Sequence, residues 1–431
     1  MKNNETAVYA LEALMKAGAD KAACCASIGR KDEFNVEANE FSLMRTLLDN
    51  TLYLKAIKDG RKGVATVNKL DKNSIDKAVA DCITLIASAL PDDAEDIAEK
   101  SENKSFDQNI GGGDLSKLFA MTKDFVEQIR DEYSKIILKR VISNFNSTQI
   151  TFVNSRGVEF NEDREFNYFS TYFSAKDGEK ISSANGYNAR FASLDKPFMD
   201  FDMHRTLLSE SELSLDPQMV DGKFIGKVIV TPGSDMILRP LLKCFLSEWS
   251  LIEGTSRWKD ALNTKVADTK LTIRTAPLHL DIVAGERVTN DGYESQDTDI
   301  IRDGVLKSFN LSLYGARKTG KPRALNTAFW TLDVAAGDTP LEEMIKSVDR
   351  GILLNRFSGA SPGPSGDVSG VAKNSFLIEN GTVNGALKET MVSFNIVDVI
   401  ANITAISRER CCEGMTILPW CCFDGITISG K

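Results

Sequence analysis

Histidine side chains are the first candidates for metal or acid–base chemistry, and the sequence contains only two of them, His204 and His279. They lie far apart along the chain, so no single helix can present a histidine pair to a metal ion at i and i+4 or i+5. His204 could pair with Asp200 or Asp202, which are its near neighbours. His279 alternates with apolar residues as in a strand, and we interpret both histidines as structural.

The eight cysteines are the next candidates, and most of them form adjacent pairs, a geometry that does not favour disulfides. The positions are Cys24-Cys25, Cys82, Cys244, Cys411-Cys412 and Cys421-Cys422. The last two pairs could suggest a four-thiolate zinc site, but adjacent residues of a strand point to opposite faces. We therefore interpret the cysteines as reduced thiols that pack as small hydrophobes. No base is placed to make any of them a nucleophile.

Two glycine-rich segments offer weaker signals of chemistry. Residues 359–363 match the G-x-S-x-G spacing of a serine nucleophile, but Pro362 removes an N–H that an oxyanion hole would need. We interpret this segment as a loop. Gly111 to Gly113 lack the preceding strand and the following Lys-Ser/Thr of a phosphate-binding loop. We expect a flexible joint there, with Asp114 as the cap of a following helix.

The charge and composition exclude some partners. The formal net charge is −9 and the isoelectric point is near 5.1, so the surface repels phosphate backbones and anionic lipids, and we expect no nucleic-acid partner. No stretch approaches the roughly 20 apolar residues of a membrane helix, and the N-terminus is typical of an amphipathic helix rather than a signal peptide. We expect a cytoplasmic protein without a membrane partner.

In the first half, apolar residues recur at helical spacing over residues 7–15 and 75–86. Between them, residues 52–56 and 64–67 read as strands joined by a turn at Asp59-Gly60. Residues 91–113 form a polar connector, which we expect to be solvated over residues 91–109 because that stretch is acidic and nearly free of large apolar groups.

Further strands are predicted at residues 149–153 and 158–160, and a composition shift at residues 209–222 marks a domain boundary. Beyond it, the pattern predicts a strand at 224–230, a turn at 231–235, one continuous helix over 237–249, a hairpin around Asp303-Gly304 and a helix at 396–403. We predict an α+β protein of two domains: residues 1–215, α/β sandwich-like with an antiparallel sheet, and the strand-rich residues 216–431.

Two long blocks of the second half carry a family resemblance. Residues 366–370 read G-D-V-S-G and are followed by I-E-N-G at residues 378–381 and by Lys388-Glu389. Upstream, residues 314–320 read Y-G-A-R-K-T-G. This pattern resembles the TldD/PmbA family, and the order of the elements before it follows the family's layout over nearly the whole chain. The resemblance is closest to the PmbA branch, also called TldE.

The resemblance also shows a departure. In the catalytic TldD branch, a helix that opens the second domain carries the zinc-binding motif H-E-x-x-x-H. Counting back from Gly254 places that window on residues 239–244, which contain no histidine and no carboxylate. Arg239 and Lys243 there would repel a zinc ion. The branch's third ligand is a C-terminal cysteine, and Cys411 or Cys412 lies in roughly that stretch. We assign no catalytic, metal-binding or cofactor-binding residue, and the peptide-binding residues stay unknown.

By resemblance, the chain is expected to be a non-catalytic subunit that pairs with a TldD-type subunit and helps to process or degrade unstructured peptides. It would be inactive alone, with zinc only in the partner. The sequence leaves open a homodimer of the isolated chain. One alternative is a stand-alone metallopeptidase that uses unrecognised ligands such as His204, His279 and a cysteine. Another is a regulatory or binding protein, since the family was once linked by name to DNA gyrase.

Overall fold

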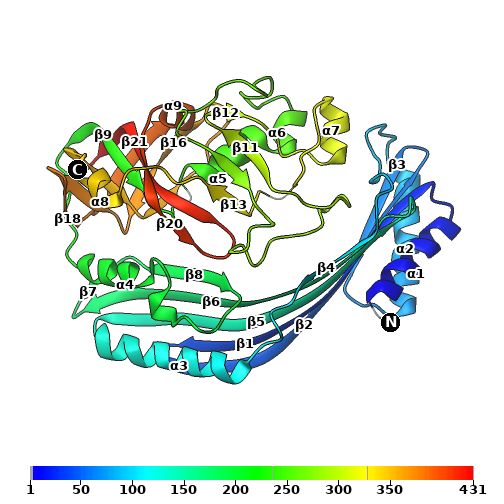
Figure 1. Ribbon diagram of the computed structural model, residues 1–431, viewed down its shortest axis with the longest axis horizontal. Coiled ribbons are helices and arrows are strands. Elements are labelled where there is room, and N and C mark those ends of the chain that lie inside the picture. Colours follow the sequence, from blue (N-terminus) through cyan, green and yellow to red (C-terminus); the bar gives the residue numbers. More distant parts are fainter. Residues whose placement is uncertain (1–2, 235, 328, 431) are drawn as a thin grey trace.

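The computed structural model describes residues 3–234, 236–327 and 329–430, and its chain builds two sheets (Figure 1). The N-terminal sheet has the order β3-β2-β1-β5-β6-β4, with β7 and β8 paired to β6. Its strands are β1 (Lys21–Glu37), β2 (Glu40–Lys58), β3 (Arg61–Val67), β4 (Lys104–Gln108), β5 (Ile136–Asn154), β6 (Glu159–Asp177), β7 (Lys180–Ile181) and β8 (Asn185–Phe191). The predicted α+β class with two domains is confirmed.

Long antiparallel hairpins dominate this sheet. The register of β1 with β2 runs from Lys21 opposite Ile57 to Glu37 opposite Glu40. The predicted turn between β2 and β3 is confirmed, since Asp59 and Gly60 both adopt positive φ, as tight hairpin turns require. The strands extend well beyond the predicted segments. The first ten residues of β2 are all exposed, so this part of the sequence lacks the alternation of buried and exposed positions by which a strand is recognised.

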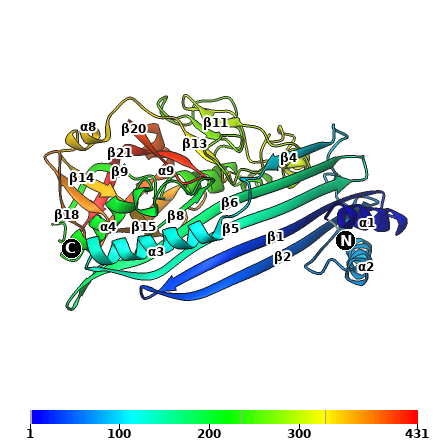
Figure 2. The same ribbon diagram turned by 60° about the horizontal axis from the view of Figure 1, so that its bottom comes forward.

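Helices cover the two ends of the N-terminal sheet. α1 (Asn3–Lys16) and α2 (Lys72–Ser88) form the predicted pair and bury their apolar faces against β1, β2 and β3. At the other end, α3 (Leu115–Glu132) and α4 (His204–Leu213) lie side by side over β5, β6 and β8, next to the short 3₁₀ helix η1 (Phe198–Asp200) (Figure 2). The Asp114 carboxylate accepts the backbone N–H of Lys117, so the predicted cap is confirmed.

The C-terminal sheet has the order β12-β11-β10-β13-β21-β9-β14-β17-β18, and β15, β16, β19 and β20 branch from it. Its strands are β9 (Lys223–Val230), β10 (Ile273–Thr275), β11 (Thr298–Arg302), β12 (Val305–Leu306), β13 (Leu332–Val334), β14 (Arg350–Leu354), β15 (Arg356–Gly359), β16 (Asp367–Lys373), β17 (Phe376–Glu379), β18 (Thr382–Ala386), β19 (Thr390–Asn395), β20 (Ile403–Cys412) and β21 (Ile417–Ser429). β9 lies between β14 and β21, and the hairpin of β11 and β12 confirms its prediction.

The continuous helix predicted over residues 237–249 is wrong. The segment divides into α5 (Leu238–Leu241), the π-helical turn η2 (Leu242–Leu246) and α6 (Glu248–Ile252). Ser247 interrupts it with an extended backbone (ψ 146°) and caps α6 by accepting the N–H of Ser250. The remaining helices are α7 (Leu313–Thr319), α8 (Leu341–Lys346) and α9 (Ile396–Ala401), which confirms the late helix. Asp235, part of the predicted turn, lies outside the described residues.

The polar connector is also not solvated as expected. The backbone of residues 94–98 is buried, and β4 adds a parallel strand to β6. Ion pairs explain the difference. Asp96, whose side chain is only 6% exposed, pairs with Lys21 (2.7 Å), Arg156 (2.8 Å) and Arg317. Because its carboxylates are paired with cations, this acidic segment can be buried although it contains few large apolar side chains.

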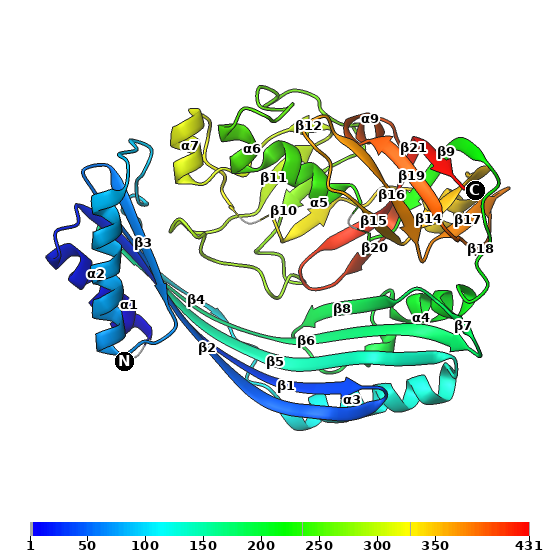
Figure 3. The same cartoon turned by 180° about the vertical axis from the view of Figure 1, so that it is seen from behind.

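The same segment joins the two halves of the molecule. Figures 1 and 3 show the N-terminal sheet as a curved layer with the C-terminal half on its concave side, and α7 facing the end that carries β3. Arg317 and Lys318 of α7 reach the acidic segment: Arg317 pairs with Asp96, and Lys318 lies 2.9 Å from Asp92. The Tyr314 hydroxyl donates to Asp92 at 3.0 Å. No helix in the described part of the chain is long and apolar enough to cross a bilayer.

Replacing Asp96 by asparagine should lower the free energy of unfolding by about 2 kcal/mol at neutral pH, because three partly exposed cations lose their shared counter-ion. Burial acts to raise the pKa of Asp96, but hydrogen bonding by Lys21 and the nearby charges hold that pKa below its ordinary value. The stabilisation is therefore present above the ordinary aspartate pKa and is lost as the pH falls through the folded-state pKa. Urea unfolding at several pH values measures it.

The matched control is Asp81→Asn on the exposed face of α2, which should change the stability by less than about 0.5 kcal/mol. Equal unfolding midpoints for the two variants would show that Asp96 does not hold the halves together.

Candidate functional site

A cleft of about 650 Å³ lies between the two halves. One wall comes from β8 and α4 of the first half, and the other comes from the turn after β9, the start of β15 and the β20–β21 turn. Its lining includes aromatic rings, side-chain amides and charged groups: Tyr172, Tyr187, Trp330 and Phe357; Asn185, Asn188 and Asn355; and Arg190, Arg239, Arg356 and Glu413. We call it the arginine cleft. Its mixed apolar and polar lining is typical of a binding site.

Charge is distributed unevenly in the arginine cleft. Three guanidinium groups line it, and Glu413 is the only carboxylate among the described lining residues. The backbone N–H of Arg190 donates to the Glu413 carbonyl at 2.8 Å, which ties β8 to the β20–β21 turn. The Arg190 guanidinium lies over the ring of Tyr168, 5.4 Å from its centroid. Burial lowers the pKa of Arg190, although the nearby Tyr168 and Glu413 oppose that shift.

Asn355 connects the cleft to a buried carboxyl group. Its Nδ2 donates to Glu210 of α4 at 2.6 Å, and its backbone N–H donates to the Ser375 hydroxyl. Burial raises the pKa of Glu210 to about 8, although the hydrogen bond from Asn355 opposes that shift. The Asn355 side chain is thereby fixed in place, with its Oδ1 buried and without a recorded partner in the described structure.

The residues that the sequence singled out lie in different places. Arg239 lines the cleft, whereas Lys243 is exposed on η2 and the Cys244 thiol donates to the Pro362 carbonyl at 3.0 Å. Cys411 is buried in the core, and the Cys412 thiol contacts the Asp281 carbonyl. It is Glu413, the next residue, that reaches the cleft.

Both histidines lie outside the cleft lining. His204 is fully buried between the rings of Phe125 and Tyr187. Its Nδ1 lies 2.8 Å from the Phe198 carbonyl, so the suggested pairing with Asp200 or Asp202 is wrong. Burial lowers its pKa to about 4, which keeps the imidazole neutral. His279 lies in a turn and not in a strand, where its Nδ1 accepts the backbone N–H of Asp281.

The cysteines behave as small hydrophobes. All eight are free thiols, and the side chains of Cys421 and Cys422 pack into two different core clusters, as opposite faces of a strand require. Burial raises the pKa of Cys421 to about 12, which keeps its side chain a neutral thiol at physiological pH. Among the residues that the structure describes, no three histidine, cysteine or carboxylate side chains gather as metal ligands do.

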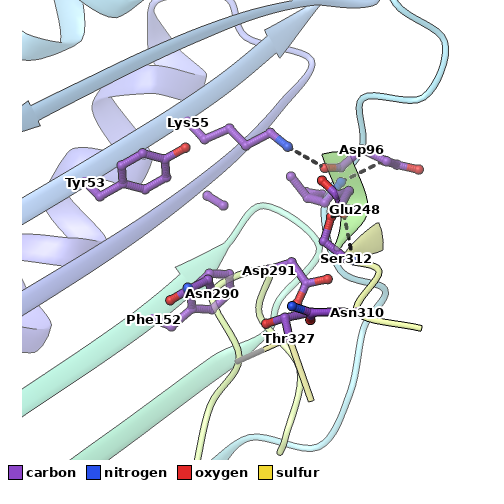
Figure 4. A pocket seen from close by; sticks show the side chains of 12 residues that line it. Tyr53, Lys55, Asp96, Phe152, Glu248, Asn290, Asp291, Asn310, Ser312 and Thr327 are labelled. Atoms are coloured by element: carbon purple, nitrogen blue, oxygen red, sulfur yellow. Dashed lines mark hydrogen bonds between the residues drawn. The ribbon is translucent and has the colours of Figure 1, made fainter. Parts of the chain in front are cut away.

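A second, smaller pocket of about 310 Å³ lies where the acidic segment meets the C-terminal half (Figure 4). Lys55 and Asp96 face it from the first half, and the Lys55 ammonium donates to the Asp96 carbonyl. From the other side, Glu248 accepts the N–H and hydroxyl of Ser312, the capping residue of α7. Most of its charged groups have partners outside the pocket lining: Lys55 pairs with Glu95 at 2.9 Å and Asp291 with Arg323 at 2.7 Å. Such satisfied polar groups are typical of a contact between domains.

Comparisons with known proteins agree with this architecture. Residues 227–430 match the model of the PmbA/TldA metallopeptidase C-terminal domain. The metalloprotease PmbA of Escherichia coli O157:H7 is 27% identical over 152 residues, which cover 35% of this chain and 34% of that protein, so the chain spans about a third of that relative. A PmbA homolog of Haemophilus influenzae is 20% identical over 426 residues, covering 93% of this chain and 90% of that protein.

The crystal structure of TldE from Thermococcus kodakarensis superposes on 98% of this chain and 100% of its own with a TM-score of 0.81, at 18% identity. The class of this protein is therefore a curved antiparallel sheet joined to a C-terminal half that matches a metallopeptidase-type domain. Over nearly its whole length the chain is similar to proteins of the TldD/PmbA family.

The arginine cleft does not fit the zinc ion that the catalytic branch of the family implies. A divalent cation needs several neutral or anionic donors at bonding distance. The described lining offers guanidinium groups, which cannot be deprotonated in proteins, and a single carboxylate. Coulomb repulsion by these cations makes the cleft unfavourable for a metal.

Glu210→Gln should flatten the dependence of stability on pH. Since the folded-state pKa is raised, the folded protein binds this proton more tightly than the unfolded chain does, so the stability due to Glu210 is full below the ordinary glutamate pKa and is lost as the pH rises through about 8. Glutamine does not ionise and should lose no stability over that range. Urea unfolding below and above pH 8 measures the difference, with the exposed Glu12→Gln as control. Parallel curves for all three proteins would contradict a shifted Glu210.

Proposed function

We propose that this chain is a non-catalytic, PmbA/TldE-like subunit that pairs with a TldD-type catalytic subunit and helps to enclose unstructured peptides. The observation that carries the proposal is the lining of the arginine cleft: Arg239, which falls in the window that the resemblance aligns with the zinc motif, lines it together with Arg190 and Arg356, and such cations repel a metal ion. The zinc and the hydrolysis are assigned to the partner.

β8 supports the proposed role in binding extended peptides. Among the described strands it pairs only with β6, and its outer edge lies beside the cleft, where the Arg190 N–H is already bonded to the Glu413 carbonyl and the residues before Arg190 pair with no further strand. An extended peptide can add to such an edge through backbone hydrogen bonds, which do not depend on the peptide's sequence. Trp330, with 57% of its surface exposed, and Tyr172 provide apolar area next to that edge.

An apolar edge on the β1–β2 hairpin supports the proposed partner. β3 pairs only with the second half of β2, so residues 40–51 of β2 leave one edge open in the described structure. Large apolar side chains are exposed there: Phe41, Leu43, Met44, Leu47 and Leu48, of which Met44 and Leu48 are 71% and 73% exposed. An open strand edge with exposed apolar groups is a typical docking surface for another chain.

Two further assignments are part of this proposal. We place the domain boundary at residues 215 and 216, which is supported by the end of α4 at Leu213 and the start of β9 at Lys223. We place the protein in the cytoplasm, because eight free cysteines suit a reducing compartment.

Mixing the purified chain with a TldD-type subunit should produce hydrolysis of an unstructured peptide that neither protein catalyses alone, with zinc found only in the partner. Chromatography of the peptide products and metal analysis of each protein measure this. Hydrolysis by the isolated chain together with stoichiometric zinc would instead support a stand-alone metallopeptidase.

Met44→Glu combined with Leu48→Glu should weaken binding of the TldD-type subunit by roughly ten-fold or more, because charges would be desolvated in an apolar interface. The control is Leu280→Glu, at a residue that is 93% exposed in another part of the surface. Co-purification yield and analytical ultracentrifugation provide the readouts. Unchanged binding by the double variant would remove the β2 edge from the interface.

A further inference from the structure

The charge of the arginine cleft is opposite to that of the whole chain. The protein carries a formal net charge of −9, yet three guanidinium groups and one described carboxylate line this cleft. Low-dielectric walls focus such a local field on whatever enters. The cleft therefore favours anionic groups, although the rest of the surface repels them.

The charge of Arg190 is compensated only in part. Its guanidinium is half-buried and rests on the Tyr168 ring, and it takes part in no ion pair of the described residues, although the charge of Glu413 acts on it from farther away. A desolvated cation without a counter-ion costs free energy that a bound anion would recover. Guanidinium is also the side chain best suited to hold a carboxylate, because it donates two parallel hydrogen bonds.

Asn355 provides a second, independent observation. Its side chain is 5% exposed, it lines the same cleft, and its Oδ1 has no recorded hydrogen-bond partner in the described structure. A buried acceptor of this kind costs about 1–3 kcal/mol when it stays unpaired, so it is expected to receive a donor. Glu210 and Ser375 hold the other polar atoms of Asn355, which leaves Oδ1 for a ligand.

We propose that the arginine cleft binds peptides through a carboxylate group, which pairs with Arg190, while Asn355 Oδ1 accepts a peptide N–H. The carboxylate is either the C-terminus of the peptide or an acidic side chain, since both present the same group. This inference rests on the proposed function in one respect, namely that peptides enter this cleft. It adds the chemistry that selects them.

The test uses the full chain without a partner and three short, N-terminally labelled glycine–serine–alanine peptides. One has a free C-terminal carboxylate, one is C-terminally amidated, and one is amidated with a single internal glutamate. In fluorescence anisotropy at low salt, a carboxylate should improve the affinity by about ten-fold or more over the plain amide. The glutamate peptide distinguishes a C-terminal carboxylate from an acidic side chain. If it binds as tightly as the free-acid peptide, the carboxylate of a side chain is sufficient for recognition.

Arg190→Gln should reduce the affinity for the free-acid peptide to that for the amidated peptide. Arg190→Lys should retain part of the preference for the free acid, because lysine keeps the positive charge but cannot donate two parallel hydrogen bonds to a carboxylate. The control is Arg130→Gln on the exposed face of α3. Asn355→Leu should weaken the acid and the amide alike. Circular dichroism checks that each variant folds. If Arg190→Gln does not fold, Arg190→Lys still tests whether Arg190 binds the carboxylate.

Equal affinities of the wild-type protein for acid and amide would overturn the inference, as would an acid preference that survives in Arg190→Gln. Binding of no peptide would also overturn it. None of these results depends on hydrolysis or on a partner, so the subunit proposal can fail while the carboxylate preference stands, and the reverse also holds.

Discussion

The ion-paired acidic segment between α2 and β4 fixes how the two halves meet at the end of the sheet that carries β3, in addition to the apolar cluster that both halves share. Asp96 joins Lys21 and Arg156 of the first half to Arg317 of α7, and Asp92 pairs with Lys318 beside it. Because the walls of the arginine cleft come from both halves, their separation is set partly by these pairs at the far end of the sheet. Charge-assisted hydrogen bonds have defined geometry, so they position the halves more strictly than an apolar contact of similar area would.

The chemistry of the cleft follows from which charges the fold brings together. Arg190 comes from β8, Arg239 from α5 and Glu413 from the β20–β21 turn, so no short sequence motif contains them. Guanidinium groups keep their charge at every physiological pH. A site built from them can therefore hold and orient an anionic ligand, whereas a guanidinium group cannot act as the base that activates a water molecule. This suits a subunit that presents substrate to chemistry located elsewhere.

Much of the fold could be predicted from local patterns. Residues 75–86 are a periodic helix, Asp59-Gly60 form a hairpin turn, and Asp114 caps a helix, because each of these depends on neighbours in the sequence. The acidic segment was misjudged because Lys21, Arg156 and Arg317, which neutralise Asp96, are distant in the sequence. Periodicity also concealed the break at Ser247, since the apolar face continues across it.

The site was less predictable than the fold. Arg239 could be found by counting along the chain from the family's conserved blocks, but nothing near Arg190, Asn355 or Glu413 marks them as lining one cleft. Only the pairing of β8 with β6, and the meeting of β8 with the β20–β21 turn, places them together. The expected strand position of His279 failed for a similar reason, because its alternating neighbours belong to turns.

The open edge of β2 has a consequence for how the cell must produce this protein. Ten successive exposed positions on a flat hairpin, several of them apolar, form a template for strand pairing with any available chain, including a second copy of this one. If the proposed TldD-type partner covers this edge, a molecule made in excess of that partner would be prone to self-association or precipitation. Balanced synthesis of the two polypeptides would then be a requirement of solubility.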